Sequence, residues 1–149
     1  MSTNKTAESL ANLTFNMIPK CQAKEDWLAE ERGLFQAELK CLRLFGSEKS
    51  LNNKEIAKRM NLSQSRLTRI IDGLVQKGYL NREIDQTDRR NIKVTLSRRG
   101  KIFTNKLDKA FMEIHTEILK DMNVSQQKDL ITTMQHLLTA SEKWLQKPE

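Results

Sequence analysis

The chain has 149 residues, which is the size of one compact domain and too short for two independent cores. No apolar run exceeds three residues and the chain does not open with a basic stretch followed by an apolar block, so we expect no membrane span, no secretory signal and a cytoplasmic location. The net charge of +7 is concentrated in residues 40–106, where 17 Lys and Arg face 6 Asp and Glu, while each flanking segment carries a net charge of −2. Such a basic block between mildly acidic arms is typical of a surface that meets nucleic-acid phosphates, although acidic membrane surfaces attract basic blocks too.

Helical periodicity dominates the first third of the chain. The N-terminal segment repeats apolar residues at helical spacing: Leu10, Leu13, Met17, Cys21 and Leu28. Pro19 falls inside this pattern, so we expect helix on both sides of it, bent or interrupted at the proline. A second helix is predicted over Gln36–Phe45, with Gly46 as its stop.

Two short helices joined by a turn are predicted next. The first covers Asn53–Met60 and is followed by Asn61 at the turn. Ser63 is suited to cap the second helix, which ends at Lys77–Gly78. Its apolar stripe has the spacing of one helix face: Leu67, Ile70, Ile71, Leu74 and Val75.

The period then changes to two, which predicts a β-hairpin from Tyr79–Asp85 and Ile92–Leu96 around a polar turn. Two further helices with apolar stripes are expected, one opened by Ser97 and Gly100 and one beginning at Ser125. The predicted fold class is therefore mainly α with a small β-hairpin wing: a winged helix-turn-helix plus a terminal-helix dimerisation region. We assign residues 36–103 to the winged part and residues 1–35 and 104–149 to dimerisation helices, all within a single domain.

The helix that begins after Ser63 carries the candidate DNA-binding residues. Its face opposite the apolar stripe is built from Ser, Thr and Arg side chains, which suit the edges of bases in a major groove, although a solvated helix face has the same composition. The hairpin turn adds two arginines, which are favoured in a minor groove. The predicted DNA-binding residues are Ser63, Gln64, Ser65, Arg66, Thr68, Arg69, Arg89, Arg90 and Lys93. We expect Asp85 and Asp88 to hold the arginine side chains of the turn, and Asp72 to pair with an arginine of the wing.

Two segments together resemble the recognition helix and wing of the multiple antibiotic resistance regulator (MarR) family. They are SQSRLTRIIDGLVQKGYL from Ser63 and DQTDRRNIKVTLSRRG from Asp85 to Gly100. The resemblance implies a homodimer with interleaved terminal helices and a small-molecule or oxidant effector that releases it from DNA. Two-fold related recognition helices require a pseudo-palindromic operator in double-stranded DNA. We expect a repressor, and activation is the alternative outcome. Many members carry Pro where Gln64 stands, so neither the operator nor the effector-binding residues are carried over.

The remaining reactive side chains do not form a recognisable catalytic or metal site. Cys21 and Cys41 are expected to be buried or semi-buried free thiols, and a role in oxidant sensing is the alternative for either. His115 and His136 lie on separate predicted helices without a ligand pair, so we expect satisfied or solvated histidines, no metal and no other cofactor. Because phosphate loops, HExxH motifs and nucleophile elbows are missing, we expect no enzyme; the alternative function is a winged-helix module that binds another protein.

Overall fold

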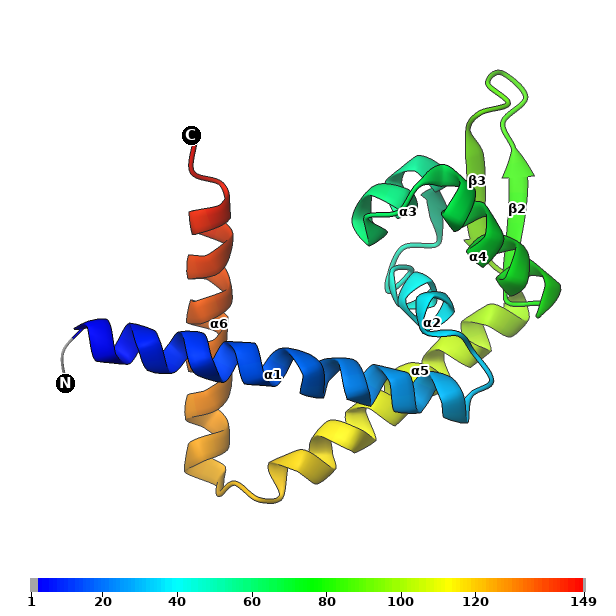
Figure 1. Cartoon of the computed structure of the whole chain (residues 1–149). Coiled ribbons are helices and arrows are strands. Elements are labelled where there is room, and N and C mark those ends of the chain that lie inside the picture. Colours follow the sequence, from blue (N-terminus) through cyan, green and yellow to red (C-terminus); the bar gives the residue numbers. More distant parts are fainter. Residues whose placement is uncertain (1–2, 149) are drawn as a thin grey trace. The chain divides into compact units, whose positions relative to one another are not determined.

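The computed structural model describes residues 3–148. Internal contacts divide the chain into two units, with the boundary between Leu107 and Asp108. The elements follow in the order α1 (Thr3–Glu31), α2 (Gln36–Arg43), β1 (Ser50–Asn52), α3 (Asn53–Met60), α4 (Gln64–Gln76), β2 (Leu80–Ile84), β3 (Ile92–Leu96), α5 (Arg98–Leu119) and α6 (Val124–Leu145) (Figure 1). The predicted class, mainly α with a small antiparallel wing, is confirmed, whereas the division into a winged part and dimerisation helices stays a prediction.

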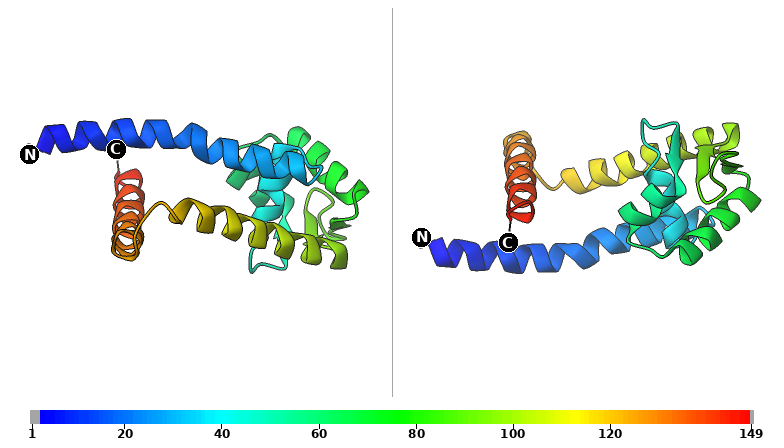
Figure 2. Two further views of the ribbon diagram at one scale, coloured as in Figure 1. Left: turned by 90° about the horizontal axis from the view of Figure 1, so that it is seen from below. Right: turned by 90° about the horizontal axis from the view of Figure 1, so that it is seen from above.

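The first helix passes through Pro19 without interruption. Both views in Figure 2 show α1 as one continuous helix, and Pro19 lies inside its bounds. A proline cannot donate to the carbonyl four residues earlier, which here belongs to Phe15. Phe15 and Pro19 are both exposed, so water can satisfy that carbonyl while the helix continues. Helix on both sides of the proline was predicted correctly, and an interruption there was wrong.

The helix-turn-helix follows the predicted boundaries closely. Helix α3 begins after Asn52, whose side-chain oxygen accepts a hydrogen bond from the Lys54 backbone N–H at 2.7 Å. It ends at Asn61, which adopts the left-handed conformation with φ of 54°. Helix α4 begins after Ser63, whose hydroxyl accepts from the Arg66 N–H at 3.3 Å. Helix α2 ends at Arg43, two residues before the predicted end.

The core of the first unit lies where α2, α3 and α4 meet the sheet. The side chains that are almost fully buried there are apolar and come from all four of these elements and from the turn after α2: Leu39, Leu42, Phe45, Ile56, Leu67, Leu74, Leu80 and Val94. Helix α4 contributes the stripe that its sequence predicts, with Ile71 buried between Leu67 and Leu74. The opposite face of α4 is therefore directed to solvent.

The wing belongs to a three-stranded antiparallel sheet with the strand order β1-β3-β2. Strand β1 was not predicted from the sequence. Val94 of β3 stands opposite Leu51 of β1 and Arg82 of β2, so these three side chains share one sheet face. Lys93 and its cross-strand neighbours, Asn52 and Glu83, share the other face. Because Leu51 and Val94 are buried, the first of these faces covers the core.

In the second unit, α6 leaves its apolar side chains uncovered. The helix begins after Asn123, one residue before the predicted start, with a reciprocal cap between Asn123 and Gln126. No residue of α6 is buried, and its large exposed apolar side chains are Val124, Ile131, Met134, Leu137, Leu138, Trp144 and Leu145. Despite these residues, none of the helices within residues 3–148 has the length and hydropathy needed to cross a bilayer.

The sheet and α5 are joined through Gly100, where two stretches of backbone approach closely. The Ser97 hydroxyl donates to the Gly78 carbonyl at 2.6 Å and accepts from the Gly100 N–H at 2.9 Å. A Cβ atom at Gly100 would lie 1.9 Å from the Tyr79 carbonyl oxygen, so only glycine fits. Gly33 differs, because its φ of 69° favours glycine but no atom lies within 4 Å of a Cβ built there.

This difference predicts that replacing glycine with alanine destabilises the protein more at Gly100 than at Gly33. Gly100→Ala should lower the free energy of unfolding by about 3 kcal/mol, because the backbone of Tyr79 must move away from the new methyl group. Gly33→Ala should lower it by only about 1 kcal/mol, the cost of a left-handed alanine. Urea unfolding followed by circular dichroism measures both, and equal losses would contradict the close approach at Gly100.

Candidate nucleic-acid interface

The exposed face of α4 gathers six of the predicted DNA-binding residues. Ser63, Gln64, Ser65, Arg66, Thr68 and Arg69 are all exposed and lie at or after the N-cap of this helix. The Thr68 hydroxyl donates to the Gln64 carbonyl at 2.8 Å, which leaves its oxygen free to accept from a ligand. In the described part of the chain, neither Arg66 nor Arg69 belongs to an ion pair, so both guanidiniums are available to an anion.

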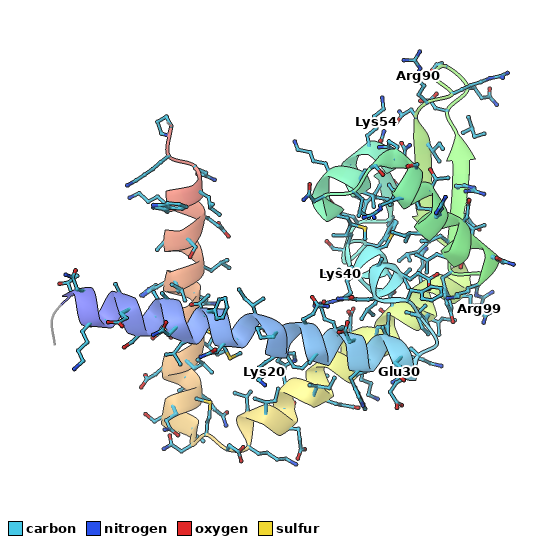
Figure 3. The ribbon with its side chains drawn as sticks, in the orientation of Figure 1. Lys20, Glu30, Lys40, Lys54, Arg90 and Arg99 are labelled. Carbon is cyan, nitrogen blue, oxygen red and sulfur yellow. The ribbon has the colours of Figure 1, made fainter. Side chains whose placement is uncertain are left out.

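Two arginines, Arg89 and Arg90, are exposed at the turn between β2 and β3. Figure 3 shows Arg90 projecting outward from the tip of the hairpin. The backbone N–H of Arg90 donates to the Asp88 carboxylate at 3.0 Å, which fixes the path of the turn. A narrow ribbon that ends in two guanidiniums has the shape and charge to enter a minor groove.

The acidic residues of the wing shape the backbone of the turn. The Asp85 carboxylate accepts from the Thr87 hydroxyl at 2.7 Å and from the Thr87 N–H at 2.9 Å, and these bonds hold the pKa of Asp85 below its ordinary value. The prediction that Asp85 and Asp88 hold arginine side chains was wrong: within residues 3–148 neither carboxylate forms an ion pair, and each accepts hydrogen bonds from the residue two positions further along. The expected pairing of Asp72 with a wing arginine is confirmed: Arg82 of β2 donates to its carboxylate.

Lys93 lies apart from the other predicted residues. Arg82 binds Asp72 of α4 from the sheet face that it shares with Val94, so Lys93, on the opposite face, points away from α4. Lys93 lines an open cleft of about 340 Å³ together with Asn52, Glu55, Glu83 and Asp85, among other residues. Three carboxylates beside one ammonium do not favour a phosphate, so nothing in this arrangement supports the DNA contact predicted for Lys93.

Asn53 connects the wing to α4 and was not among the residues that the sequence singled out. Its side chain is 8% exposed, and it makes hydrogen bonds to Gln64 of α4 and to the backbone of β3 at Ile92. Beside it, the Asn52 side chain donates to the Asn91 side chain at the end of the wing turn. The only sequence signal for this connection is a pair of asparagines at a helix start, which is also explained by N-capping alone.

Lys54 extends the basic surface next to the wing. It is exposed in the first turn of α3, and Figure 3 shows it at the same end of the first unit as Arg90. An ammonium at this place can reach the phosphate backbone beside the groove that the wing enters. The sequence offered no reason to prefer Lys54 to the other lysines of the basic block.

Comparison with known families and proteins agrees with this geometry. Residues 34–92, which include α2, α3, α4 and the wing turn, match the model of the MarR family. This segment of the chain is similar to the MarR-family domain. Eight of the nine predicted DNA-binding residues fall inside the matched segment, and Lys93 is the first residue beyond it.

Relatives and solved structures extend the likeness beyond residues 34–92. The HTH-type transcriptional regulator SarZ of Staphylococcus saprophyticus is 31% identical over 93 residues, which cover 62% of this chain and 62% of that protein. The HTH-type transcriptional repressor YetL of Bacillus subtilis is 32% identical over 108 residues, which cover 66% of this chain and 65% of that protein. The chain thus spans slightly less than two thirds of these two relatives. A MarR transcriptional regulator from Methanosarcina mazei has the same fold, with a TM-score of 0.75 at 19% identity over 91% of this chain and 98% of that one.

The two cysteines differ in their surroundings. Cys41 of α2 is buried, and burial, helped by the nearby charge of Glu38, raises the pKa of its thiol to about 12. A thiol with so high a pKa forms little of the thiolate that oxidants attack, which argues against Cys41 as an oxidant sensor. Cys21 of α1 is exposed within the chain, so the expectation of a buried or semi-buried thiol was wrong for this residue. Oxidant sensing by Cys21 stays a hypothesis.

The histidines are not assembled with metal-binding side chains. His115 Nδ1 lies 2.8 Å from the Phe111 carbonyl oxygen, which makes it the satisfied histidine that the sequence predicts. Over residues 3–148, no three side chains of the His, Cys, Asp or Glu type come together in a way that could hold a metal ion.

The burial of Cys41 predicts that its thiol is alkylated slowly in the folded protein. In the variant Cys21→Ser, alkylation by iodoacetamide at pH 8 should be at least about a thousandfold slower in the folded protein than in urea, because about one Cys41 thiol in ten thousand is ionised in the folded protein. Mass spectrometry of timed samples measures the rate. Rapid alkylation without denaturant would show that the pKa of Cys41 is not raised.

Proposed function

We propose that this protein is a DNA-binding transcription regulator, in which α4 enters the major groove and the wing turn the adjacent minor groove. The observation that carries the proposal is the exposed α4 face of Gln64, Ser65, Arg66 and Arg69, presented next to a hairpin whose tip holds Arg89 and Arg90. The net charge of +11 over residues 40–106 supplies the attraction to phosphates.

The proposed assembly is a homodimer held by the terminal helices. Helices α1 and α6 expose apolar side chains that their own unit does not cover, among them Leu13 and Phe15 on α1 and Leu138 and Trp144 on α6. Apolar surface of this extent marks an interface in a protein that stays in solution. A two-fold dimer presents two equal recognition helices, so the operator should be a pseudo-palindrome with half-sites about 10 base pairs apart.

The proposed mode of regulation is repression that is relieved by an effector. Repression is supported by YetL, whose name describes it as a repressor. The proposal that a small molecule or an oxidant releases the protein from DNA rests on the similarity of residues 34–92 to the MarR family. Such an effector acts only if it binds the DNA-competent and DNA-free arrangements with different affinities. Titration of the protein–DNA complex with aromatic acids and with peroxide measures that difference.

Mutations in α4 and in the wing turn should have different effects on DNA binding. Arg69→Ala should cost about 1–3 kcal/mol on the cognate duplex and relax the preference at one position of each half-site, because a guanidinium on α4 reads a base edge. Arg90→Ala should weaken binding to all sequences alike and flatten the salt dependence, because the wing meets phosphates and a minor groove. Duplexes selected from a random pool supply the cognate site, and fluorescence anisotropy at several salt concentrations supplies the affinities.

Three results would count against this assignment. An equal loss on cognate and scrambled duplexes for Arg69→Ala would remove this side chain from base readout. Unchanged binding by Arg90→Ala would remove the wing from the interface. Selection of no duplex by the unaltered protein would overturn DNA binding itself and leave a winged-helix module for a protein partner. Neither arginine has a role in the core, so circular dichroism should be unchanged in both variants.

The dimer should depend on the apolar face of α6. Light scattering at micromolar concentration should give about twice the chain mass of 17.3 kDa for the unaltered protein. Leu138→Glu should shift the equilibrium towards the monomer, because it places a charge in an apolar interface. Thr132→Glu, on the opposite face of the same helix, is the matched control and should remain a dimer. A monomeric unaltered protein with intact helicity would contradict the assembly.

A further inference from the structure

The side-chain amide of Asn53 has only one possible orientation, because backbone groups determine it. Its oxygen accepts from the Ile92 backbone N–H at 3.1 Å, and its nitrogen makes a longer contact of 3.5 Å to the Arg90 backbone carbonyl. A backbone N–H can only donate and a carbonyl can only accept, so the oxygen of Asn53 must face Ile92 and the nitrogen must face Arg90. The wing backbone thus sets the direction of this amide.

The side-chain amide of Asn53 in turn determines the orientation of the side-chain amide of Gln64. The nitrogen of Asn53 lies 3.2 Å from the side-chain oxygen of Gln64, the first residue of α4. Since an amide nitrogen only donates, the atom of Gln64 that faces it must be the oxygen. The Nε2 group, with two N–H donors, is therefore at the free end of an exposed side chain in the first turn of the recognition helix.

Burial keeps this arrangement in place. Asn53 and Glu38 are the two polar or charged residues within residues 3–148 that are buried. Turning the buried Asn53 amide over would break its hydrogen bonds to the wing backbone, and water could not replace them at a buried site. Asn53 therefore keeps its present orientation. Gln64, which is exposed, is the partner that adapts.

We propose that the wing backbone, acting through Asn53, makes Gln64 a donor towards DNA, so that Gln64 selects a base edge rich in acceptors. This inference rests on the proposed function, in which the first turn of α4 enters the major groove. Guanine presents two acceptors there, N7 and O6, and thymine presents O4, whereas cytosine presents the N4 donor. The two-bond contact of a glutamine with adenine needs the amide oxygen as well, and that oxygen is engaged by Asn53. Asn53 is a positioning residue, and Gln64 is the residue that touches the base.

The base that Gln64 contacts is found by comparing two selections. Duplexes selected from a random pool by the unaltered protein and by Gln64→Ala should differ at one position of each half-site. At that position the unaltered protein should prefer guanine to cytosine by about tenfold, and Gln64→Ala should have no preference. This pair of selections assigns the position before the positioning residue is altered.

The decisive variant is Asn53→Asp, which keeps the shape of the side chain and removes its donors. An aspartate still accepts from the Ile92 N–H, but towards Gln64 it can only accept, so Gln64 must turn its Nε2 inward and its oxygen outward. The preference at the assigned position should then invert to bases with a major-groove donor, cytosine and adenine. Asn81→Asp, an exposed change of the same charge on β2, is the matched control and should leave guanine preferred.

The surface variant Gln64→Glu provides an independent test that does not disturb the buried amide. One carboxylate oxygen still accepts from Asn53 and the other faces outward, so the assigned position should again favour cytosine over guanine. If Asn53→Asp folds and still prefers guanine, or if Gln64→Glu does, the inference is wrong while DNA binding stands. If the unaltered protein selects no duplex, the proposed function itself is wrong, so the two failures are distinguishable.

Discussion

The arrangement of the first unit depends on the burial of one helix stripe. Leu67, Ile71 and Leu74 of α4 are each less than 5% exposed, and burial of such side chains contributes about 2 kcal/mol apiece. A helix that must turn this stripe towards α2, α3 and the sheet has no freedom to rotate about its axis. The direction of its polar face is therefore a consequence of the core, and Ser65, Thr68 and Arg69 are presented to solvent as a rigid set.

The basic block presents free cations because its acidic residues are occupied locally. Arg59 binds both Glu48 and Glu55, and its hydrogen bond holds the pKa of Glu48 below the ordinary value. Asp72 is paired with Arg82, and Asp85 is engaged by the wing turn. The carboxylates therefore order the scaffold, and the cations of the described chain that they leave unpaired include Arg66 and Arg69 on α4 and Arg89 and Arg90 at the tip of the wing. A net charge alone does not reveal this separation, which needs the partners of each carboxylate.

The elements with a long periodic pattern were predictable, and those that depend on contacts between distant residues were not. Asn53–Met60 and the stripe of α4 follow from local spacing and capping, and the structure has them at the predicted positions. Strand β1 has three residues, too few to alternate, and forms because β3 offers it hydrogen-bonding partners. Asn53 meets Ile92 across 39 residues of sequence, and no local pattern encodes that contact. Lys93 was predicted to bind DNA together with the turn arginines, and only the strand register shows that it lies on the sheet face opposite to that of Val94 and Arg82.

The ion pair between Glu38 and Lys77 has a mechanical consequence. The Lys77 ammonium donates to the buried Glu38 carboxylate at 2.5 Å and to the Gly33 carbonyl at 3.2 Å, so one cation is held by α2 and by the turn that follows α1. Lys77 caps the end of α4, and a Cβ at Gly73 would lie 2.7 Å from Glu38. The C-terminal end of α4 is thus fixed to α2 and to the turn after α1, while its N-terminal end is held by Leu67 in the core and by the hydrogen bond between Asn53 and Gln64. The end of α1 is therefore coupled to the orientation of α4 through a single ammonium group, that of Lys77.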